Sequence, residues 1–263
     1  RDRGFGRALA WQLPRPGNRL SQHRADREGP VSLRMSAPAH TLQIAGLRVE
    51  GEAGRTLLRV PALTIEPGSA VVLRGPSGAG KSTFLHAVAG LIAPAEGAVI
   101  WGQTDLATLR PSARAAFRRA HMGIVFQDHL LFEELSVAGN AALAALYAPS
   151  GARAAIRAGA AAGLARLGLS GRGRHRALTC SGGERQRIAV ARALAGDPGI
   201  VLADEPTASL DRANAERLAD DLLALARSDG KTLIVVSHDP ALQARADRII
   251  EIADGQIAEP AHA

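Results

Sequence analysis

The sequence has 263 residues, of which 46% are hydrophobic, so it can form at least one well-packed domain, and a disordered or fibrous chain is excluded. Its single cysteine, Cys180, excludes a disulfide framework and fits a reducing compartment. The net charge of +7 is concentrated in residues 1–34, which contain eight arginines and three acidic residues. The other 229 residues therefore carry a net charge of only +2. We therefore expect no nucleic-acid partner.

Residues 1–34 show no sustained periodicity and contain Pro14, Pro16 and Pro30. Three hypotheses are open for them: a native disordered arm, a targeting segment, and upstream sequence joined wrongly to a start at Met35. We favour the last, and a signal peptide is disfavoured because the segment has no apolar core. No transmembrane helix is expected either, because the longest uncharged run, residues 135–152, is too polar and too interrupted to span a bilayer.

From Thr41 onward, short apolar runs alternate with helical patterns, which predicts an α/β fold. Strands are expected at Leu42–Leu47, Leu63–Ile65, Val71–Leu73, Val99–Trp101, Ile124–Phe126, Ile200–Ala203, Leu233–Val236 and Arg248–Ile252. Helices are expected at Ser82–Ala89, Ser136–Tyr147, Ala152–Leu167, Gly182–Ala195, Arg212–Arg227 and Pro240–Ala246. Asp254-Gly255 predicts a hairpin turn. The alanine- and arginine-rich stretch from Ala138 to Leu169 predicts an inserted helical lobe.

A glycine-rich motif, G-x-x-x-x-G-K-[ST], follows the predicted strand Val71–Leu73 and opens a helix. In such a loop the backbone N–H groups point at phosphate oxygens, and the helix N-terminus favours negative charge. Lys81 is expected to contact the β- and γ-phosphates, and the Ser82 hydroxyl to ligate Mg²⁺. The alternative, a plain glycine-rich turn, is disfavoured by the strand–helix context. The expected nucleotide-binding residues are Gly75, Pro76, Ser77, Gly78, Ala79, Gly80, Lys81, Ser82 and Thr83.

Polar side chains follow three further strands, where ligand sites of open α/β sheets lie. The buried run that ends at Asp204-Glu205 is expected to supply a magnesium ligand, Asp204, and a catalytic base for water, Glu205. Gln127 is expected to position water and complete the magnesium shell, and His238 to bind the γ-phosphate. Alternatively, Asp204-Glu205 is a solvated acidic turn, and Gln127 and His238 are local helix caps. These alternatives are disfavoured because four strand ends bring polar side chains to one edge of the sheet.

Ser181-Gly182-Gly183-Glu184 combines a capping box, which predicts a helix start, with two glycines that weaken a first turn unless a ligand approaches the backbone. With this element the sequence resembles the ATP-binding-cassette family, whose hallmark is a serine–glycine–glycine signature between the glutamine loop and the carboxylate strand. Ser209, Leu210 and Asp211 are similar to the family's D-loop. The resemblance covers about Thr41 to Ile257, and the region around Gln127 resembles the lipoprotein-release and macrolide-export group.

The resemblance implies an α/β fold with a P-loop NTPase core, a mostly parallel sheet, an antiparallel β subdomain and an inserted α-helical subdomain. It implies one nucleotide-binding domain over residues 35–263, with the helical lobe at about 128–180. The implied cofactors are ATP and Mg²⁺. The implied partners are a second copy of the chain or a similar cassette, whose signature closes over the ATP, and transmembrane permease subunits. The implied location is peripheral, at the cytoplasmic face of the inner (plasma) membrane.

Two points depart from the resemblance. Cys180 occupies the position before Ser181 where the family usually has leucine, and the segment Thr41–Arg59 has no aromatic residue to stack on adenine, so Arg48 or Val49 is expected to pack there. A DNA-maintenance ATPase is disfavoured because only 100 residues separate Lys81 from Ser181, without heptads. A soluble cassette that acts in assembly, such as iron–sulfur biogenesis, stays open as the alternative function.

Overall fold

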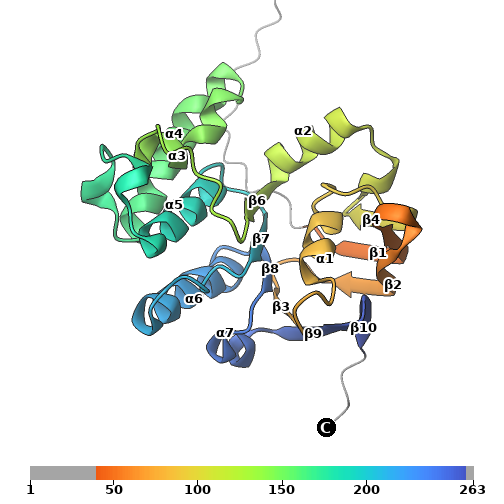
Figure 1. The fold of residues 1–263 in the computed structure, drawn as a ribbon. Helices are drawn as coiled ribbons and strands as arrows, with labels where there is room; N and C mark the ends of the chain where they lie inside the picture. Colours follow the sequence, from red (N-terminus) through yellow and green to blue (C-terminus); the bar gives the residue numbers. More distant parts are fainter. Residues whose placement is uncertain (1–39, 259–263) are drawn as a thin grey trace, which may run out of the picture. The chain divides into compact units, whose positions relative to one another are not determined.

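Ten strands of the described part of the chain, residues 40–258, form one mixed sheet in the computed structural model (Figure 1). The strand order across the sheet is β5-β4-β1-β2-β10-β9-β3-β8-β7-β6. The strands are β1 (Leu42–Glu50), β2 (Thr56–Ile65), β3 (Ala70–Arg74), β4 (Glu96–Trp101), β5 (Thr104–Asp105), β6 (Met122–Val125), β7 (Ile200–Asp204), β8 (Thr232–Val236), β9 (Arg248–Ala253) and β10 (Gln256–Ala258). Residues 1–34, for which we favour a misjoined start, lie outside the described residues.

The parallel half of the sheet joins β9, β3, β8, β7 and β6. Its central strands are apolar at almost every position because helices cover both faces. In β8, Ile234 and Val236 belong to the core that contains Phe84 of α1 (Lys81–Val88). Leu233 and Val235 belong to the core beneath α6 (Arg212–Arg227). The predicted buried strands are therefore confirmed, and the sheet separates two cores.

The antiparallel half joins β5, β4, β1 and β2, and the short strand β10 connects it to β9. The expected antiparallel β element is thus an extension of the same sheet. Strand β2 is ten residues long, whereas we expected only Leu63–Ile65. Pro61 argues against a strand when only the sequence is considered. In the structure it lies opposite Gly46, and these two residues are not paired in the ladder between β1 and β2. The Asp254-Gly255 hairpin is confirmed, since both residues have positive φ between paired strands.

A helix that we did not predict, α2 (Pro111–His121), leads directly into β6. It contains no fully buried residue, and Phe117, which packs partly buried against the core, is its only large apolar side chain. Pro111 at its first turn is the one start signal. The remaining helix of the nucleotide-binding core, α7 (Pro240–Arg245), follows β8 and agrees with the predicted segment.

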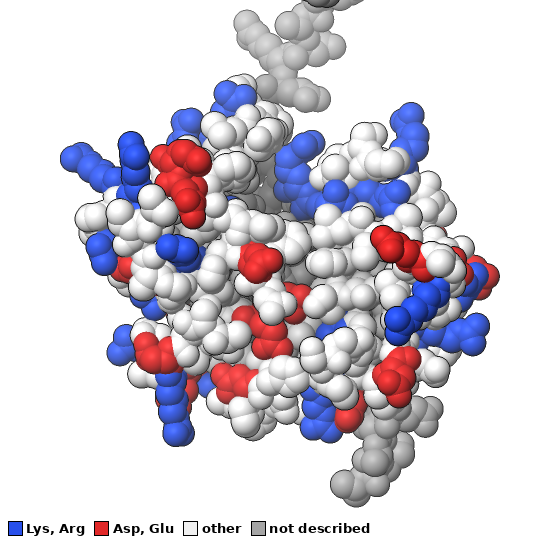
Figure 2. Space-filling model, in the orientation of Figure 1, with Lys and Arg blue, Asp and Glu red and all other residues white. Residues whose placement is uncertain are grey.

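The helical lobe contains α3 (Val137–Ala141), α4 (Ser150–Arg166) and α5 (Gly182–Leu194), which pack against one another. The single helix expected over Ser136–Tyr147 is wrong: α3 ends at Ala141, and a 3-10 turn follows at Leu143–Leu146. Both α5 and α2 contact β6, so the lobe and α2 are joined to the same edge strand (Figure 1). Basic side chains gather over α4 and α2 on the face drawn in Figure 2.

Candidate nucleotide site

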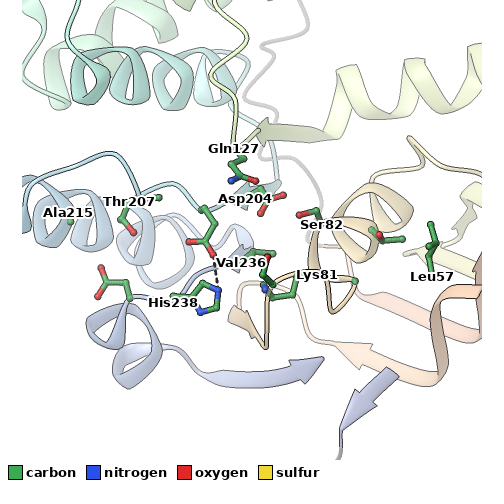
Figure 3. Close-up of a pocket in the computed structure, with 16 residues that line it drawn as sticks. Leu57, Lys81, Ser82, Gln127, Asp204, Thr207, Ala215, Val236 and His238 are labelled. Atoms are coloured by element: carbon green, nitrogen blue, oxygen red, sulfur yellow. Dashed lines mark ion pairs between the residues drawn. The ribbon is translucent and has the colours of Figure 1, made fainter. Parts of the chain in front are cut away.

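A cavity of about 740 Å³ opens where β3, β6, β7 and β8 end. The parallel register brings these ends together: Leu73 pairs with Val236, and Asp204 pairs with the same valine from the other side. Figure 3 shows residues from all four strand ends around this cavity. The lining combines Leu57, Ser77, Gly78, Gly80, Lys81, Ser82, Thr83, Gln127, Asp204, Glu205, Thr207, Ala208, Ala215, Val236, His238 and Asp239.

The loop between β3 and α1 depends on its glycines. Gly75 has φ of +147°, and a Cβ at this position would lie 1.9 Å from the Ile252 carbonyl oxygen. Gly80 has φ of +104° and allows the chain to enter α1 beside the backbone of β2. The Lys81 ammonium is largely buried and donates hydrogen bonds of 2.8 Å to the carbonyls of Gly75 and Pro76. The loop therefore places the positive charge of Lys81 beside its own backbone groups, at the N-terminus of α1.

The carboxylates after β7 lie in different surroundings. Asp204 ends the strand and is only 6% exposed, whereas Glu205 leaves the strand with φ of +48°, a left-handed conformation that is uncommon for a non-glycine residue. The Glu205 N–H donates to the Val236 carbonyl at 2.9 Å, which fixes this turn to β8. Burial raises the pKa of Glu205, while His238 and Lys81 act in the opposite direction. His238 Nε2 lies 3.5 Å from Glu205 Oε1 (Figure 3).

Three oxygen-bearing side chains meet on one side of the cavity. Ser82, Gln127 and Asp204 come from α1, the end of β6 and the end of β7, and Figure 3 draws them close to one another. A hydroxyl, an amide and a carboxylate are hard oxygen donors of the kind that Mg²⁺ prefers over nitrogen or sulfur ligands. The donor set therefore fits a magnesium ion that the protein shares with a phosphate ligand.

Near the start of β2, the residue that lines the cavity is Leu57. Arg48 and Val49, which we expected to pack on adenine, are absent from the lining. Val49 is fully buried in the sheet, so the expectation for Val49 is wrong. Arg48 forms ion pairs with Glu50 and Glu96. The Leu57 carbonyl lies 3.1 Å from a Cβ placed on Gly80, so the start of β2 is held directly beside the phosphate loop. Sequence reasoning missed Leu57 because the strand that carries it was not predicted.

The signature element forms the predicted capping box. The Ser181 hydroxyl accepts from the Glu184 N–H, and the Glu184 carboxylate accepts from the Ser181 N–H at 2.9 Å. The bond from the Ser181 N–H, together with Arg172, lowers the pKa of Glu184. Leu210 lies against Gly183: a Cβ on this glycine would lie 2.9 Å from Leu210 Cδ2, the end of a flexible side chain. The D-loop therefore packs on the signature helix within one chain.

The structure does not bring the signature residues into the cavity. Ser181, Gly182, Gly183 and Glu184 are absent from its lining among the described residues, and Ser181 and Gly182 are exposed. Of the D-loop, Ser209 is exposed and Asp211 caps α6 by accepting from the Asn214 N–H at 3.0 Å. The site thus gathers the phosphate loop and the strand-end residues, and leaves an exposed glycine-containing helix N-terminus elsewhere on the surface.

The segment after Gln127 is bound to α5 and to the D-loop. Arg192 of α5 donates to the carbonyls of Leu130 and His129 at 2.6 and 2.8 Å. His129 Nε2 lies 3.4 Å from the Ser209 hydroxyl. Burial lowers the pKa of both His129 and Arg192. The backbone two and three residues after Gln127 is therefore hydrogen-bonded to the signature helix.

Comparisons with known proteins agree with this geometry. The family described as ABC transporter matches residues 58–208. A lipoprotein-releasing system ATP-binding protein LolD from Novosphingobium aromaticivorans is 43% identical over 199 residues, which cover 76% of this chain and 88% of that protein. A macrolide export ATP-binding/permease protein MacB from Rhodopseudomonas palustris is 42% identical over 223 residues. That match covers 82% of this chain and 33% of MacB, so the chain spans about a third of the length of its MacB relatives.

Solved structures show the same fold. The dimeric structure of MJ0796, a bacterial ABC transporter cassette, has a TM-score of 0.76 and 32% identity, and the match covers 83% of this chain and 97% of that one. A post-hydrolysis state of the same cassette, bound to ADP and Pi, superposes with the same TM-score of 0.76.

Proposed function

The chain belongs to the ABC transporter family, and we propose that it binds and hydrolyses ATP to power a membrane transporter. The observation that carries this proposal is the convergence of Lys81, Gln127, Asp204, Glu205 and His238 on one cavity at the ends of four neighbouring strands. A phosphate loop alone supports binding. The carboxylate and amide groups opposite it add what hydrolysis needs, which is a metal site and a base for water.

Within this proposal each side chain has a separate role. Lys81 and the loop N–H groups bind the β- and γ-phosphates, and Ser82, Asp204 and Gln127 hold Mg²⁺, partly through water. Bound Mg²⁺ neutralises phosphate charge. Glu205 orients the attacking water and accepts its proton, and a raised pKa suits a carboxylate for this role. His238, 3.5 Å from Glu205, donates a hydrogen bond to the γ-phosphate and limits how far the pKa of Glu205 rises.

The exposed signature supports the proposal of a dimer with two shared ATP sites. Ser181 and Gly182 lie outside the cavity of their own chain, at an exposed helix N-terminus that favours anions. They can serve a nucleotide only if it is presented by another molecule, such as a second copy or a similar cassette. The related MJ0796 cassette has a dimeric structure.

We further propose that the partner in transport is a permease and that the chain acts at the cytoplasmic face of the inner membrane. Within residues 40–258, none of the helices combines the length and apolar character that crossing a bilayer requires. The docking segment, Asp128–Asn140, follows Gln127 and exposes Leu130 and Phe132 at 57% and 52%. Exposed large apolar side chains next to a nucleotide-sensing residue are suited to receive a partner helix.

Phosphate release by the purified full chain tests the ATPase proposal. Lys81→Ala should abolish release, because the phosphates lose their fixed cation. Lys231→Ala is the matched control, since Lys231 is the other lysine of the sequence and pairs with Asp197 outside the cavity. Equal rates in the parent chain and the Lys81 variant would contradict the proposal. Extraction in detergent and identification of co-purifying membrane subunits separates a transporter from a cassette that acts in assembly.

A further inference from the structure

Charge is unevenly distributed within the folded part of the chain. Residues 106–183 carry ten arginines and three acidic residues, a net charge of +7. The other described residues, 40–105 and 184–258, carry 14 basic and 18 acidic residues. The near-neutral total outside the first 34 residues therefore conceals a basic region, which comprises α2, the docking segment and most of the helical lobe.

Most of these arginines have no side-chain partner among residues 40–258. Arg166 and Arg172 form ion pairs with Asp221 and Glu184, and two others, Arg118 and Arg153, donate to backbone carbonyls. Within the described residues, the remaining six side chains form neither an ion pair nor a side-chain hydrogen bond. These unpaired arginines are Arg110, Arg114, Arg119, Arg157, Arg174 and Arg176, and all but the half-buried Arg114 are exposed.

The unpaired arginines lie on two separate parts of the fold. Three belong to α2 or its cap, and three belong to the lobe. Figure 1 shows α2 and the α3–α4 pair on either side of the chain that leaves β6, and Figure 2 shows basic side chains over both. The three acidic residues of the region, Asp128, Glu133 and Glu134, all fall in the docking segment, which lies between α2 and α4 in the sequence. The docking segment is therefore acidic and apolar, and unpaired arginines precede and follow it along the chain.

We propose that the unpaired arginines of α2 and the lobe contact the anionic headgroups of the membrane on which the protein works. An extended anionic surface can meet the charges of α2 and those of the lobe at once. An acidic protein segment seated on the docking segment would instead meet Asp128, Glu133 and Glu134 and be repelled. Guanidinium groups bind phosphate oxygens in a bidentate manner, which suits phospholipid headgroups. This membrane contact is separate from ATP hydrolysis, because none of these arginines lines the nucleotide cavity.

Vesicle sedimentation with the full chain tests the proposal. The probes are sucrose-loaded vesicles of phosphatidylcholine alone and of phosphatidylcholine with phosphatidylglycerol. The test variant carries Arg110, Arg119, Arg157 and Arg174 as glutamine, and residues 1–34 are unchanged in every sample. Each arginine near such a surface is worth roughly fivefold in binding, so the variant, which lacks four of them, should bind the anionic vesicles roughly 600-fold more weakly. Parent binding should also weaken as salt rises.

The matched control changes four exposed arginines outside the basic region, Arg212, Arg217, Arg227 and Arg248, to glutamine. A loss of tenfold or more confined to the test variant, with unchanged ATPase activity, supports the proposal. The proposal is overturned if the test variant loses less than tenfold in vesicle binding or if the control loses as much. It is also overturned if binding of the parent chain does not depend on phosphatidylglycerol. Loss of permease co-purification without loss of vesicle binding also overturns it, because the arginines would then serve a protein. The ATPase readout tests the proposed function separately.

Discussion

Leu57 offers a direct test of how the protein holds the base of its nucleotide. The side chain lines the cavity and is 36% exposed, so a bound base can cover about the last third of it. Complete burial of a leucine contributes about 1.5–3 kcal/mol, and a third of this is about 0.5–1 kcal/mol. Leu57→Ala should therefore weaken ATP binding by roughly two- to fivefold. GTP should lose as much, because an aliphatic surface does not distinguish purines.

Isothermal titration of both nucleotides into the parent chain and the variant measures this effect. Leu91→Ala serves as the control, since Leu91 is 41% exposed and does not line the cavity. The two parent affinities should also be similar, because no aromatic residue between Thr41 and Arg59 can stack on the base. A loss above tenfold that affects ATP alone would mean that Leu57 reads the base. Unchanged affinities would place the base elsewhere in the cavity.

Four further predictions concern the proposed machinery. Glu205→Gln should keep ATP binding, cut turnover by roughly 10²–10⁴ and trap an ATP-bound dimer in size-exclusion chromatography; near-normal turnover would remove Glu205 from the mechanism. His238→Ala should move the acid limb of the residual ATPase pH profile to higher pH, because the pKa of Glu205 loses an opposing influence; an unmoved limb would show that Glu205 does not control it. Ser181→Arg should abolish hydrolysis while monomers still bind ATP, and mixed dimers with Lys81→Ala should recover part of it, since one of their two sites is intact; no recovery would contradict shared sites. Glu134→Lys should spare basal ATPase activity and weaken substrate-stimulated activity of the assembled transporter; equal loss of both would mean that the segment supports the fold.

The sequence was sufficient to predict the parallel half of the sheet because burial on both faces leaves an uninterrupted apolar run. Val71–Leu73 and Leu233–Val236 carry this pattern and lie paired in the structure. The capping box was equally predictable, because Ser181 and Glu184 are fixed by local spacing. The strand-end side chains followed from one rule, that parallel strands present their carboxyl ends at one edge.

Elements whose pattern depends on distant neighbours were not predictable. Strand β2 contains Pro61, which is tolerated only because the ladder passes over Gly46 opposite it. The helix α2 has one large apolar side chain, Phe117, and no fully buried residue, so few apolar residues marked it as a helix that packs on the core. The packing of Leu210 against Gly183 joins segments separated by the whole of β7. The sequence therefore suggested only a ligand at that glycine, whereas Leu210 of the same chain also lies against it.

The contacts of the segment after Gln127 connect the nucleotide cavity with the signature helix of the same chain. Gln127 lies in the nucleotide cavity, and two residues later His129 lies 3.4 Å from the Ser209 hydroxyl of the D-loop. Arg192 ties the same backbone to the helix that begins at the signature. Burial lowers the pKa of Arg192, and its two hydrogen bonds hold the backbone of His129 and Leu130 to α5. Because His129 and Leu130 lie two and three residues after Gln127, we expect a shift of Gln127 toward a phosphate to act on the signature helix through these bonds. Occupation of a chain's own cavity should then reposition the surface that it offers to a second nucleotide.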